Sequence, residues 1–320
     1  MKLSEIYELA VKTGITNDPR GKKEVERTLK NAKKAFDGLK GEEKKEFDQE
    51  KLVNPYSDSR VLYGAPETEV KTVLTGIDIE VGEVLLADRL REKGRPVDLI
   101  IAHHPEGKAL ADLSEVMGMQ AEIMEIFGVP INVGEGLMAP RIGEVKRGLM
   151  PLNHNKAVDA ARILDIPIMC VHTPADNMVT TALQNIINKK DPETVGDVVK
   201  ILKDIPEFAE GARTGAGPTI VTGDKQRKCG KVFVDMTGGT GGSEDSFARL
   251  SQAGVGTIVC MHIGEKHRKE AEKNHINVII AGHMASDSMG MNLILDEIAK
   301  QGVEIIPCSG LTRVSRLKGK

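Results

Sequence analysis

The sequence predicts an α/β protein made of two duplicated α/β units, with mostly parallel or mixed sheets flanked by helices and a helical extension at the N-terminus. Short, nearly continuous apolar runs alternate with amphipathic segments, and this alternation occurs twice along the chain. Polar residues follow the apolar runs at similar places in both units. Strands that are apolar throughout are typical of sheets covered by helices on both faces.

The composition limits the classes of protein that fit. Of the 320 residues, 40% are hydrophobic and 28% charged, and the formal net charge is −3. The chain can bury a sizeable core, and its charge gives no general attraction to nucleic acid or anionic lipid. No stretch approaches the roughly 20 apolar residues of a membrane span, and the N-terminus shows no signal-like segment. We therefore expect a cytoplasmic protein.

The cysteines indicate what kind of metal site the chain could build. They are far apart and form no CxxC pair, at Cys170, Cys229, Cys260 and Cys308. This spacing argues against a disulfide framework and against a zinc ribbon. Any metal would therefore depend on histidine and carboxylate ligands.

Three segments are expected along the chain. Residues 1–60 form a polar helical extension, in which 22–39 (KKEVERTLKNAKKAFDGL) is the clearest amphipathic helix and 54–60 (NPYSDSR) ends the helical pattern. Residues 61–210 form a first α/β lobe, with strands expected at 70–78, 97–104 and 166–177 and helices at 83–94, 113–128, 155–164 and 193–205.

Residues 211–320 form the second lobe, joined to the first near the Gly-rich stretch 210–218 (EGARTGAGP). Its expected strands are 230–239, 256–264 and 276–284, and its expected helices are 246–254 and 265–275. The two lobes also match in detail. Asp78 and Asp235 close their first strands, and His103 and His262 follow at the ends of the next strands, which indicates an internal duplication.

Polar pairs stand at the ends of three predicted strands: His103 with His104, His172 with Asp176, and His283 with Asp287. The carboxyl ends of parallel strands share one edge of a sheet, where ligands bind. Each pair alone has an ordinary explanation, such as a strand cap, a core histidine or a helix cap. Their joint occurrence at three strand ends favours convergence on a site.

Several imidazoles and two carboxylates favour metal coordination. This donor set suits zinc, iron, manganese, cobalt or nickel and contains too much nitrogen for magnesium or calcium. Because one ion takes three or four protein ligands, this number of candidates favours two ions. Two ions roughly 3.5–4 Å apart can share a carboxylate and activate a water.

The same stretches carry a resemblance to a known family. DLIIAHHP (98–105), VHTPADN (171–177) and AGHMASD (281–287) resemble the signatures of the NGG-interacting factor three family. These Nif-three-like dinuclear metal proteins are often labelled GTP cyclohydrolase type-two homologues. The Gly-rich stretch 238–255 and residues 265–283 also resemble the final third of that family, and the likeness covers about 60–310.

The resemblance implies a homohexamer of duplicated α/β units that holds two divalent metal ions per subunit, with zinc, iron or manganese as the candidates. The implied metal ligands are His103, His104, Asp176, His283 and Asp287. His172 is then expected to orient the Asp176 loop or face substrate, and His267 is a candidate for proton transfer at the rim of the site. We list these two histidines as the candidate catalytic residues.

The sequence also departs from the family pattern. Asp287 replaces the usual late glutamate and is one methylene shorter. Glu106 and Lys108 follow the HHP motif where the family is usually apolar. The stretch 134–156 supplies extra length, and its His154 is interpreted as a loop residue. The Gly-rich turn 237–246 is interpreted as close-packed, with contact to an anionic ligand as the alternative.

Two functions fit these observations. The first is a metal-dependent hydrolase that uses a metal-activated water on a nucleotide or another small phosphorylated or heterocyclic substrate. The alternative is a non-catalytic protein that binds or delivers metal or acts as a regulatory scaffold. A small-molecule substrate and a homo-oligomeric partner copy are expected, and neither membrane nor specific nucleic-acid binding is.

Overall fold

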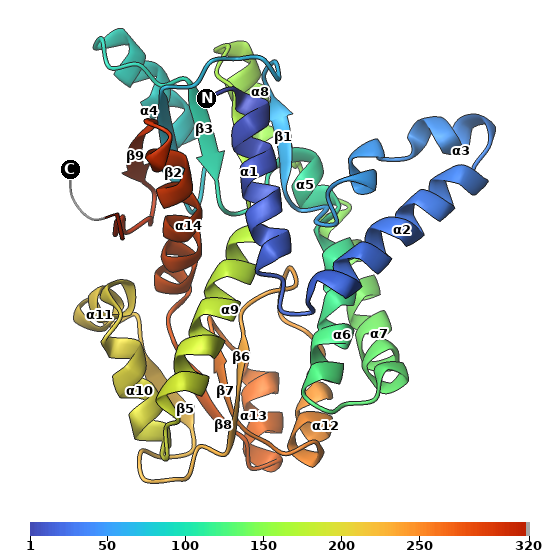
Figure 1. The fold of residues 1–320 in the computed structure, drawn as a ribbon, viewed down its shortest axis with the longest axis vertical. Helices are drawn as coiled ribbons and strands as arrows, with labels where there is room; N and C mark the ends of the chain where they lie inside the picture. The colour runs from blue at the N-terminus through green and yellow to red at the C-terminus, as the bar shows by residue number, and fades with distance from the viewer. Residues whose placement is uncertain (318–320) are drawn as a thin grey trace.

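Two mixed sheets, each flanked by helices, form the framework of the protein, one in the upper and one in the lower half of Figure 1. The structure is a computed structural model and describes residues 1–317. The predicted α/β class with duplicated units is confirmed, because the two sheets repeat one strand arrangement.

The first sheet has the order β1-β4-β3-β2-β9. Its edge strand β1 runs antiparallel to β4, and the other pairs are parallel. The buried patterns of β2 and β3 match the apolar runs in the sequence. The strands are β1 (Arg60–Tyr63), β2 (Thr72–Gly76), β3 (Leu99–Ala102), β4 (Ile168–Cys170) and β9 (Glu304–Cys308).

The second sheet, of order β5-β8-β7-β6, repeats this plan, with β5 antiparallel to β8 and the other pairs parallel. Its strands are β5 (Thr219–Thr222), β6 (Lys231–Asp235), β7 (Val255–Cys260) and β8 (Asn277–Ile280). Strand β9 comes from the C-terminal part of the chain and pairs with β2. The C-terminal part of the chain therefore contributes strands to both sheets. The division of the chain into domains 1–60, 61–210 and 211–320 remains a proposal.

The strand register corrects one detail of the predicted duplication. Ala102 lies opposite Gly76 in the first sheet, and Cys260 lies opposite Asp235 in the second. Two residues beyond Ala102 and Cys260 stand His104 and His262. His262 therefore corresponds to His104 and not to His103, because spacing in the sequence alone does not fix the register of a strand pair.

Helices cover both sheets. The two 3-10 helices are η1 (Gln49–Leu52) and η2 (Leu113–Gly118). The α-helices are α1 (Leu3–Thr16), α2 (Lys22–Gly38), α3 (Gly41–Glu46), α4 (Val81–Glu92), α5 (Gly107–Ala111), α6 (Met119–Ile126), α7 (Ile131–Leu149), α8 (Lys156–Ile163), α9 (Thr173–Lys190), α10 (Val195–Lys203), α11 (Pro206–Arg213), α12 (Ser246–Gln252), α13 (Glu265–Lys273) and α14 (His283–Lys300). Among the described residues, no helix has the length and apolarity needed to span a membrane.

Helices α9 and α14 occupy the middle of the molecule and connect the two sheets (Figure 1). Each begins directly after a parallel strand, α9 after β4 and α14 after β8. The two helices approach closely at Gly290, where an added Cβ would lie 2.3 Å from the carbonyl oxygen of Ala175. This contact fixes the distance between the helix starts that carry Asp176 and Asp287.

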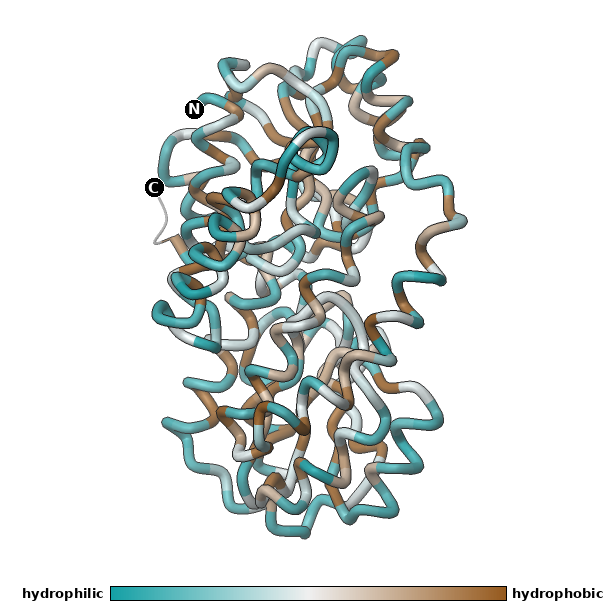
Figure 2. The backbone as a smooth tube through the Cα atoms, turned by 90° about the vertical axis from the view of Figure 1, so that its right-hand side faces the viewer, coloured by the Kyte–Doolittle hydropathy of each residue, from teal (hydrophilic) through white to brown (hydrophobic). Residues whose placement is uncertain are grey.

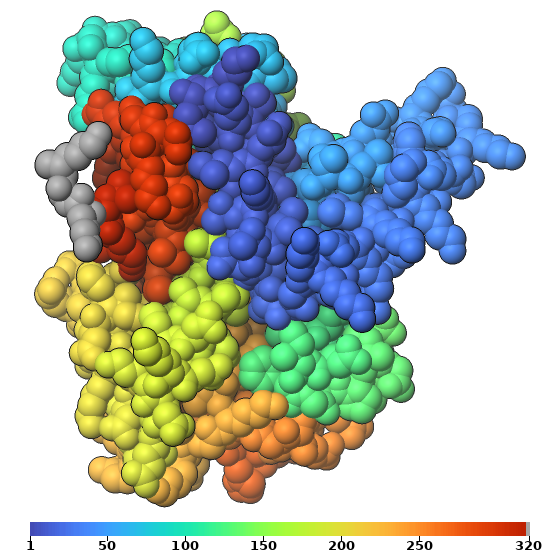
Figure 3. All heavy atoms as spheres, in the orientation of Figure 1, coloured from blue at the N-terminus to red at the C-terminus, as the bar shows by residue number. Residues whose placement is uncertain are grey.

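Hydrophobic stretches lie mainly inside the two lobes in Figure 2, as expected for helices and strands that share a core. The N-terminal helices behave in two ways. Helix α1 buries Leu3, Ile6 and Ala10 in the core beside α9 and α14. Helices α2 and α3 project from the body as an arm (Figure 3), and Val25 is the buried residue of α2.

Helix α7 was not predicted, because its 19 residues include four glycines and Pro140, which usually interrupt helices. Tertiary packing explains it. Gly134 lies against α6, where an added Cβ would be 3.2 Å from Ala121, and Met138 is buried in the core with α6. All four cysteines are free, which agrees with the absence of a disulfide framework.

The close approach at Gly290 makes a stability prediction. Gly290→Ala places a methyl group against the Ala175 carbonyl and should lower the free energy of unfolding by about 1–3 kcal/mol, as overpacking does. Gly136→Ala, at an exposed position in α7 with no neighbouring atom, should instead stabilise by up to about 1 kcal/mol. Urea unfolding of both variants measures this, and equal effects would contradict the role given to Gly290.

Candidate metal centre

The three polar pairs converge between the two sheets. His103 and His104 follow β3, His172 and Asp176 stand at the start of α9, and His283 and Asp287 stand in the first turns of α14. Ligand atoms from all six side chains fall into overlapping groups that could hold a metal ion. The first sheet thus supplies four of these residues and the helix after the second sheet supplies two.

Asp287 lies at the centre of the cluster. Its Oδ1 is 3.5 Å from His103 Nε2, and its Oδ2 is 3.6 Å from His104 Nε2 and 3.4 Å from His283 Nε2. These distances exceed the 2.7–3.2 Å of ordinary N–H···O hydrogen bonds. Two ligands of one tetrahedral ion, each about 2.0–2.2 Å from it, lie roughly 3.3–3.6 Å apart. The spacing therefore fits coordination.

Asp176 adds a second carboxylate on the side of His103. Its Oδ1 is 3.5 Å from His103 Nε2, and its Oδ2 is 3.7 Å from His172 Nε2. Within residues 1–317, His103 Nε2, Asp176 Oδ1 and both oxygens of Asp287 are buried without a hydrogen-bond partner. Leaving a charged group buried and unpaired costs several kcal/mol. Cations placed among these atoms would remove that cost, so the residues fit a metal site.

Three histidines have their rings oriented by acceptors at Nδ1. Nδ1 lies 3.0 Å from the Val171 carbonyl oxygen in His103, 2.6 Å from Asp78 Oδ1 in His104 and 2.8 Å from Asp58 Oδ2 in His172. Because these oxygens accept a hydrogen bond, Nδ1 carries the proton and a neutral ring keeps its lone pair on Nε2. All three Nε2 atoms then point into the cluster as potential ligands.

The pKa shifts of His104 and Asp176 agree with a site that binds cations. Burial, together with the charges of His103 and His172, lowers the pKa of His104 to about 4. Burial also raises the pKa of Asp176 well above its ordinary value, with the charges of Asp287 and Asp58 in the same direction. Burial would likewise raise the pKa of Asp287, but the nearby histidines outweigh it and lower that pKa.

Asp58 was not predicted from the sequence; it is a fully buried residue that positions His172. Its Oδ2 accepts hydrogen bonds from His172 Nδ1 at 2.8 Å and from Thr173 Oγ1 at 2.6 Å. Burial opposes the charge, but the bond with His172 outweighs it and lowers the pKa of Asp58. Because β1 is antiparallel, its beginning lies beside the end of β4, and Asp58 precedes β1. The polar run at 57–59 is its only signal in the sequence.

Other candidates lie outside the cluster. His267 Nε2 contacts the Gly242 carbonyl oxygen at 2.9 Å, in a cavity beside the metal candidates. His154 contacts the Leu149 carbonyl oxygen at 2.9 Å and stays away from the site.

Lys108 pairs with Asp48. Burial raises the pKa of Glu106 to about 7, with the charges of Glu80 and Asp78 adding to it.

His262 is a further residue at the site that was noticed only as part of the duplication. Its ring centroid lies 5.0 Å from that of His283. Burial lowers the pKa of His262, and the charge of His283 lowers it further. His262 also lines the cavity that contains His267, so it stands between that cavity and the metal candidates.

Comparison with solved structures identifies the class. The chain is similar to a NIF3 superfamily protein from Sphaerobacter thermophilus, with 28% identity and a TM-score of 0.68 over 80% of this chain and 92% of the other. Reduced HcgD from Methanocaldococcus jannaschii and protein SA1388 from Staphylococcus aureus are both 17% identical. They cover 77% and 79% of this chain and 87% and 89% of their own, with TM-scores of 0.49 and 0.42.

The last two likenesses are too distant to support an inference about function. No family model matches the sequence, and no curated protein sequence is similar to it. The fold, the duplicated sheets and the similarity to the Sphaerobacter protein nevertheless agree. These findings support a NIF3-like family for the chain, in agreement with the resemblance stated from the sequence motifs.

The geometry predicts how metal content responds to substitution. If the cluster holds the two ions expected from the sequence, His283→Ala should leave one ion per chain, since His283 Nε2 lies 3.4 Å from Asp287 Oδ2, the oxygen that also faces His104. Asp287→Ala should remove both ions, because both of its oxygens face candidate ligands. His267→Ala should keep both ions, because His267 lies outside the cluster. Mass spectrometry of the metals in purified protein checks this, and full occupancy of Asp287→Ala would contradict the shared carboxylate.

Asp58 gives a prediction about pH. Asp58→Asn should destabilise the metal-free protein by about 3–5 kcal/mol at neutral pH, because it breaks a buried charge-assisted pair. The folded-state pKa of Asp58 is lowered, so its stabilising contribution is present above the ordinary carboxyl pKa of about 3.9 and is lost as pH falls through the folded-state pKa.

The stability difference between wild type and Asp58→Asn should therefore narrow below about pH 4. Unfolding curves at several pH values, measured with a chelator present, test this. Asp204→Asn, at an exposed position, serves as the control and should show no such difference. If the stability difference between wild type and Asp58→Asn stays constant down to low pH, the charge of the Asp58 carboxylate does not contribute to stability.

Proposed function

We propose that the protein is a metal-dependent hydrolase that acts on a nucleotide or another small phosphorylated or heterocyclic substrate. One observation carries this proposal: the candidate ligand set is closed on one side and open on the other. The side chains of His103 and Asp287 are 1% and 0% exposed, whereas those of His104 and His283 are 26% and 39% exposed. An open side leaves room for substrate, as catalytic metal sites require.

The ligands divide into two sets that share Asp287. His103, Asp176 and Asp287 Oδ1 would hold one ion, and His104, His283 and Asp287 Oδ2 would hold the other. Zinc, iron and manganese all suit this mixture of imidazole and carboxylate. Divalent ions held there would supply Lewis acidity and lower the pKa of a water molecule. The short side chain of Asp287 reaches both sets because Gly290 lets α14 approach α9 closely.

His172 is the residue placed to move a proton. Its Nδ1 is held by Asp58, and its Nε2 lies 3.7 Å from Asp176 Oδ2 on the wall of the open side. A neutral ring held in this tautomer can accept a proton at Nε2. His267 lies farther away, inside the neighbouring cavity, and we assign it contact with substrate rather than with the ions.

The alternative is a protein that binds, delivers or senses metal without turnover. The complete burial of Asp287 and the near-complete burial of His103 favour it, because closed sites retain metal tightly. We also propose a homo-oligomer, a hexamer by resemblance to the family. Large apolar side chains that are exposed in the single chain, such as Ile163, Met150 and Val53, would be covered in such an assembly.

Turnover distinguishes the two functions. The metal-loaded protein should hydrolyse at least one member of a panel of nucleotides and phosphoesters, and chelation should abolish this. His172→Asn keeps a donor for Asp58 but has no group at the position of Nε2. It should retain metal and lower kcat by about 10²–10⁴-fold, as loss of a general base does. If the fully loaded wild type hydrolyses nothing in the panel, the alternative is supported instead.

A further inference from the structure

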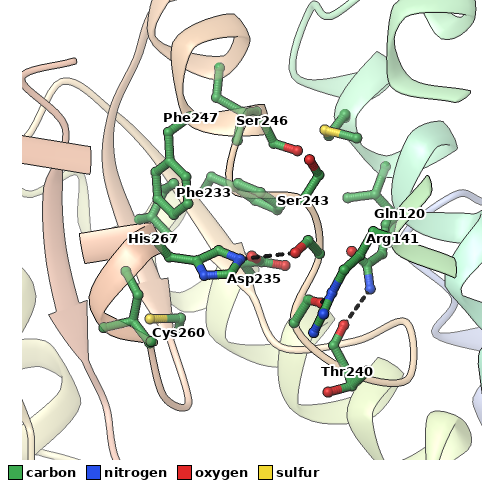
Figure 4. A pocket seen from close by; sticks show the side chains of 18 of the residues that line it. Gln120, Arg141, Phe233, Asp235, Thr240, Ser243, Ser246, Phe247, Cys260 and His267 are labelled. Atoms are coloured by element: carbon green, nitrogen blue, oxygen red, sulfur yellow. Dashed lines mark hydrogen bonds between the residues drawn. The ribbon is translucent and has the colours of Figure 1, made fainter. Parts of the chain in front are cut away.

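A cavity of about 270 Å³ lies at the second sheet, beside the candidate metal ligands (Figure 4). Its walls are largely apolar and come from β6, β7, α6 and α12, with Phe233, Phe247, Leu250 and Ile258 among them. This volume is slightly below the 300–1,000 Å³ usual for small-molecule sites. A ligand with one or two rings would fill it.

The cavity is connected to the metal candidates. A smaller hollow is lined by His172, Asp176 and His283 on one side and by Asp235 and His262 on the other. Asp235 and His262 also line the larger cavity. A ligand whose ring occupies the cavity would therefore project its substituent past His262 toward the ions.

Asp235 is the carboxylate that lines the cavity. It ends β6 beside His267, as Figure 4 shows, and its exposed side chain lines both hollows. Within the described residues, no hydrogen bond to its carboxylate is present, and desolvation by the surrounding protein atoms raises its pKa to about 6 against the charge of His267. A carboxylate in apolar surroundings gains most from a ligand with N–H groups.

The Gly-rich loop closes the remaining side. Gln120 Nε2 donates to the carbonyl oxygens of Gly238 and Thr240 at 2.6 and 2.7 Å, and Arg141 Nε donates to that of Gly241 at 3.0 Å. An added Cβ at Gly238 would lie 2.6 Å from Gln120 Cγ. The loop is thus close-packed, as the sequence suggested, and it forms a fixed part of the lining of both hollows.

We propose that this cavity is the specificity pocket of the protein and takes a flat nitrogen heterocycle of one or two rings, whose N–H edge is bound by the Asp235 carboxylate beside Phe233 and Phe247. The apolar walls supply most of the binding, and Asp235 selects rings with donors over rings without them. The assignment of this ring as part of a substrate rests on the proposed function; the binding of the ring does not.

Calorimetry on the full-length protein tests the pocket with two probes. 2-Aminobenzimidazole presents two adjacent N–H donors on one edge, and benzimidazole lacks the amino group. We expect 2-aminobenzimidazole to bind about tenfold or more tightly than benzimidazole, because a hydrogen bond to a charged group is worth about 1.5–3 kcal/mol. Equal binding of the two compounds, or no binding of either, would overturn the proposal.

Variants locate the site. Asp235→Asn should weaken binding of 2-aminobenzimidazole about tenfold or more while metal content stays at the wild-type level. Asp245→Asn changes the same charge at an exposed position nearby that does not line the cavity, and it should leave binding unchanged. Unchanged binding in Asp235→Asn would overturn the assignment of the N–H edge to this carboxylate.

The His283→Ala variant tests the pocket independently of the proposed hydrolase function. It should lose one of the two proposed ions but still bind 2-aminobenzimidazole, because His283 does not line the cavity. If the protein shows no turnover but its binding of the ring depends on Asp235, the hydrolase proposal fails. The pocket proposal is then still supported. Loss of ring binding in His283→Ala would place the ring at the metal centre and overturn the pocket.

Discussion

The buried carboxylate of Asp287 is the constraint on which the rest of the site depends. Within residues 1–317, both of its oxygens lie inside the protein without a hydrogen-bond partner, and they face histidines that follow two different sheets. A carboxylate is stable in this position only if positive charge lies beside it. The close contact of α14 with α9 at Gly290 and the acceptors behind the histidine rings all hold groups around this one side chain.

The duplication explains how one chain builds both a candidate metal centre and a neighbouring cavity. In the first sheet, the ends of β3 and β4 carry His103, His104 and His172. In the second sheet, the matching end of β7 carries His262, and β6 ends on Asp235 where β2 ends on Gly76. The two halves share one strand arrangement, but their strand ends carry candidate metal ligands in one half and line the cavity in the other.

Much of this could be predicted from the sequence. Apolar runs and polar strand ends identified β2, β3, β4, β6, β7 and β8, and the rule that parallel strands end at one edge brought the six candidate residues together. The remainder depends on tertiary contacts that leave little trace in a sequence. Asp58 reaches the site because β1 is antiparallel, and α7 forms despite four glycines and Pro140 because α6 packs against it.

The central claim is that one aspartate joins two metal ions. A crystal structure of the metal-loaded protein, with anomalous data collected at the absorption edge of the bound metal, tests it most directly. The account predicts two anomalous peaks per chain, roughly 3.5–4 Å apart, with one oxygen of Asp287 next to each. A single peak, or two peaks that Asp287 does not connect, would contradict it.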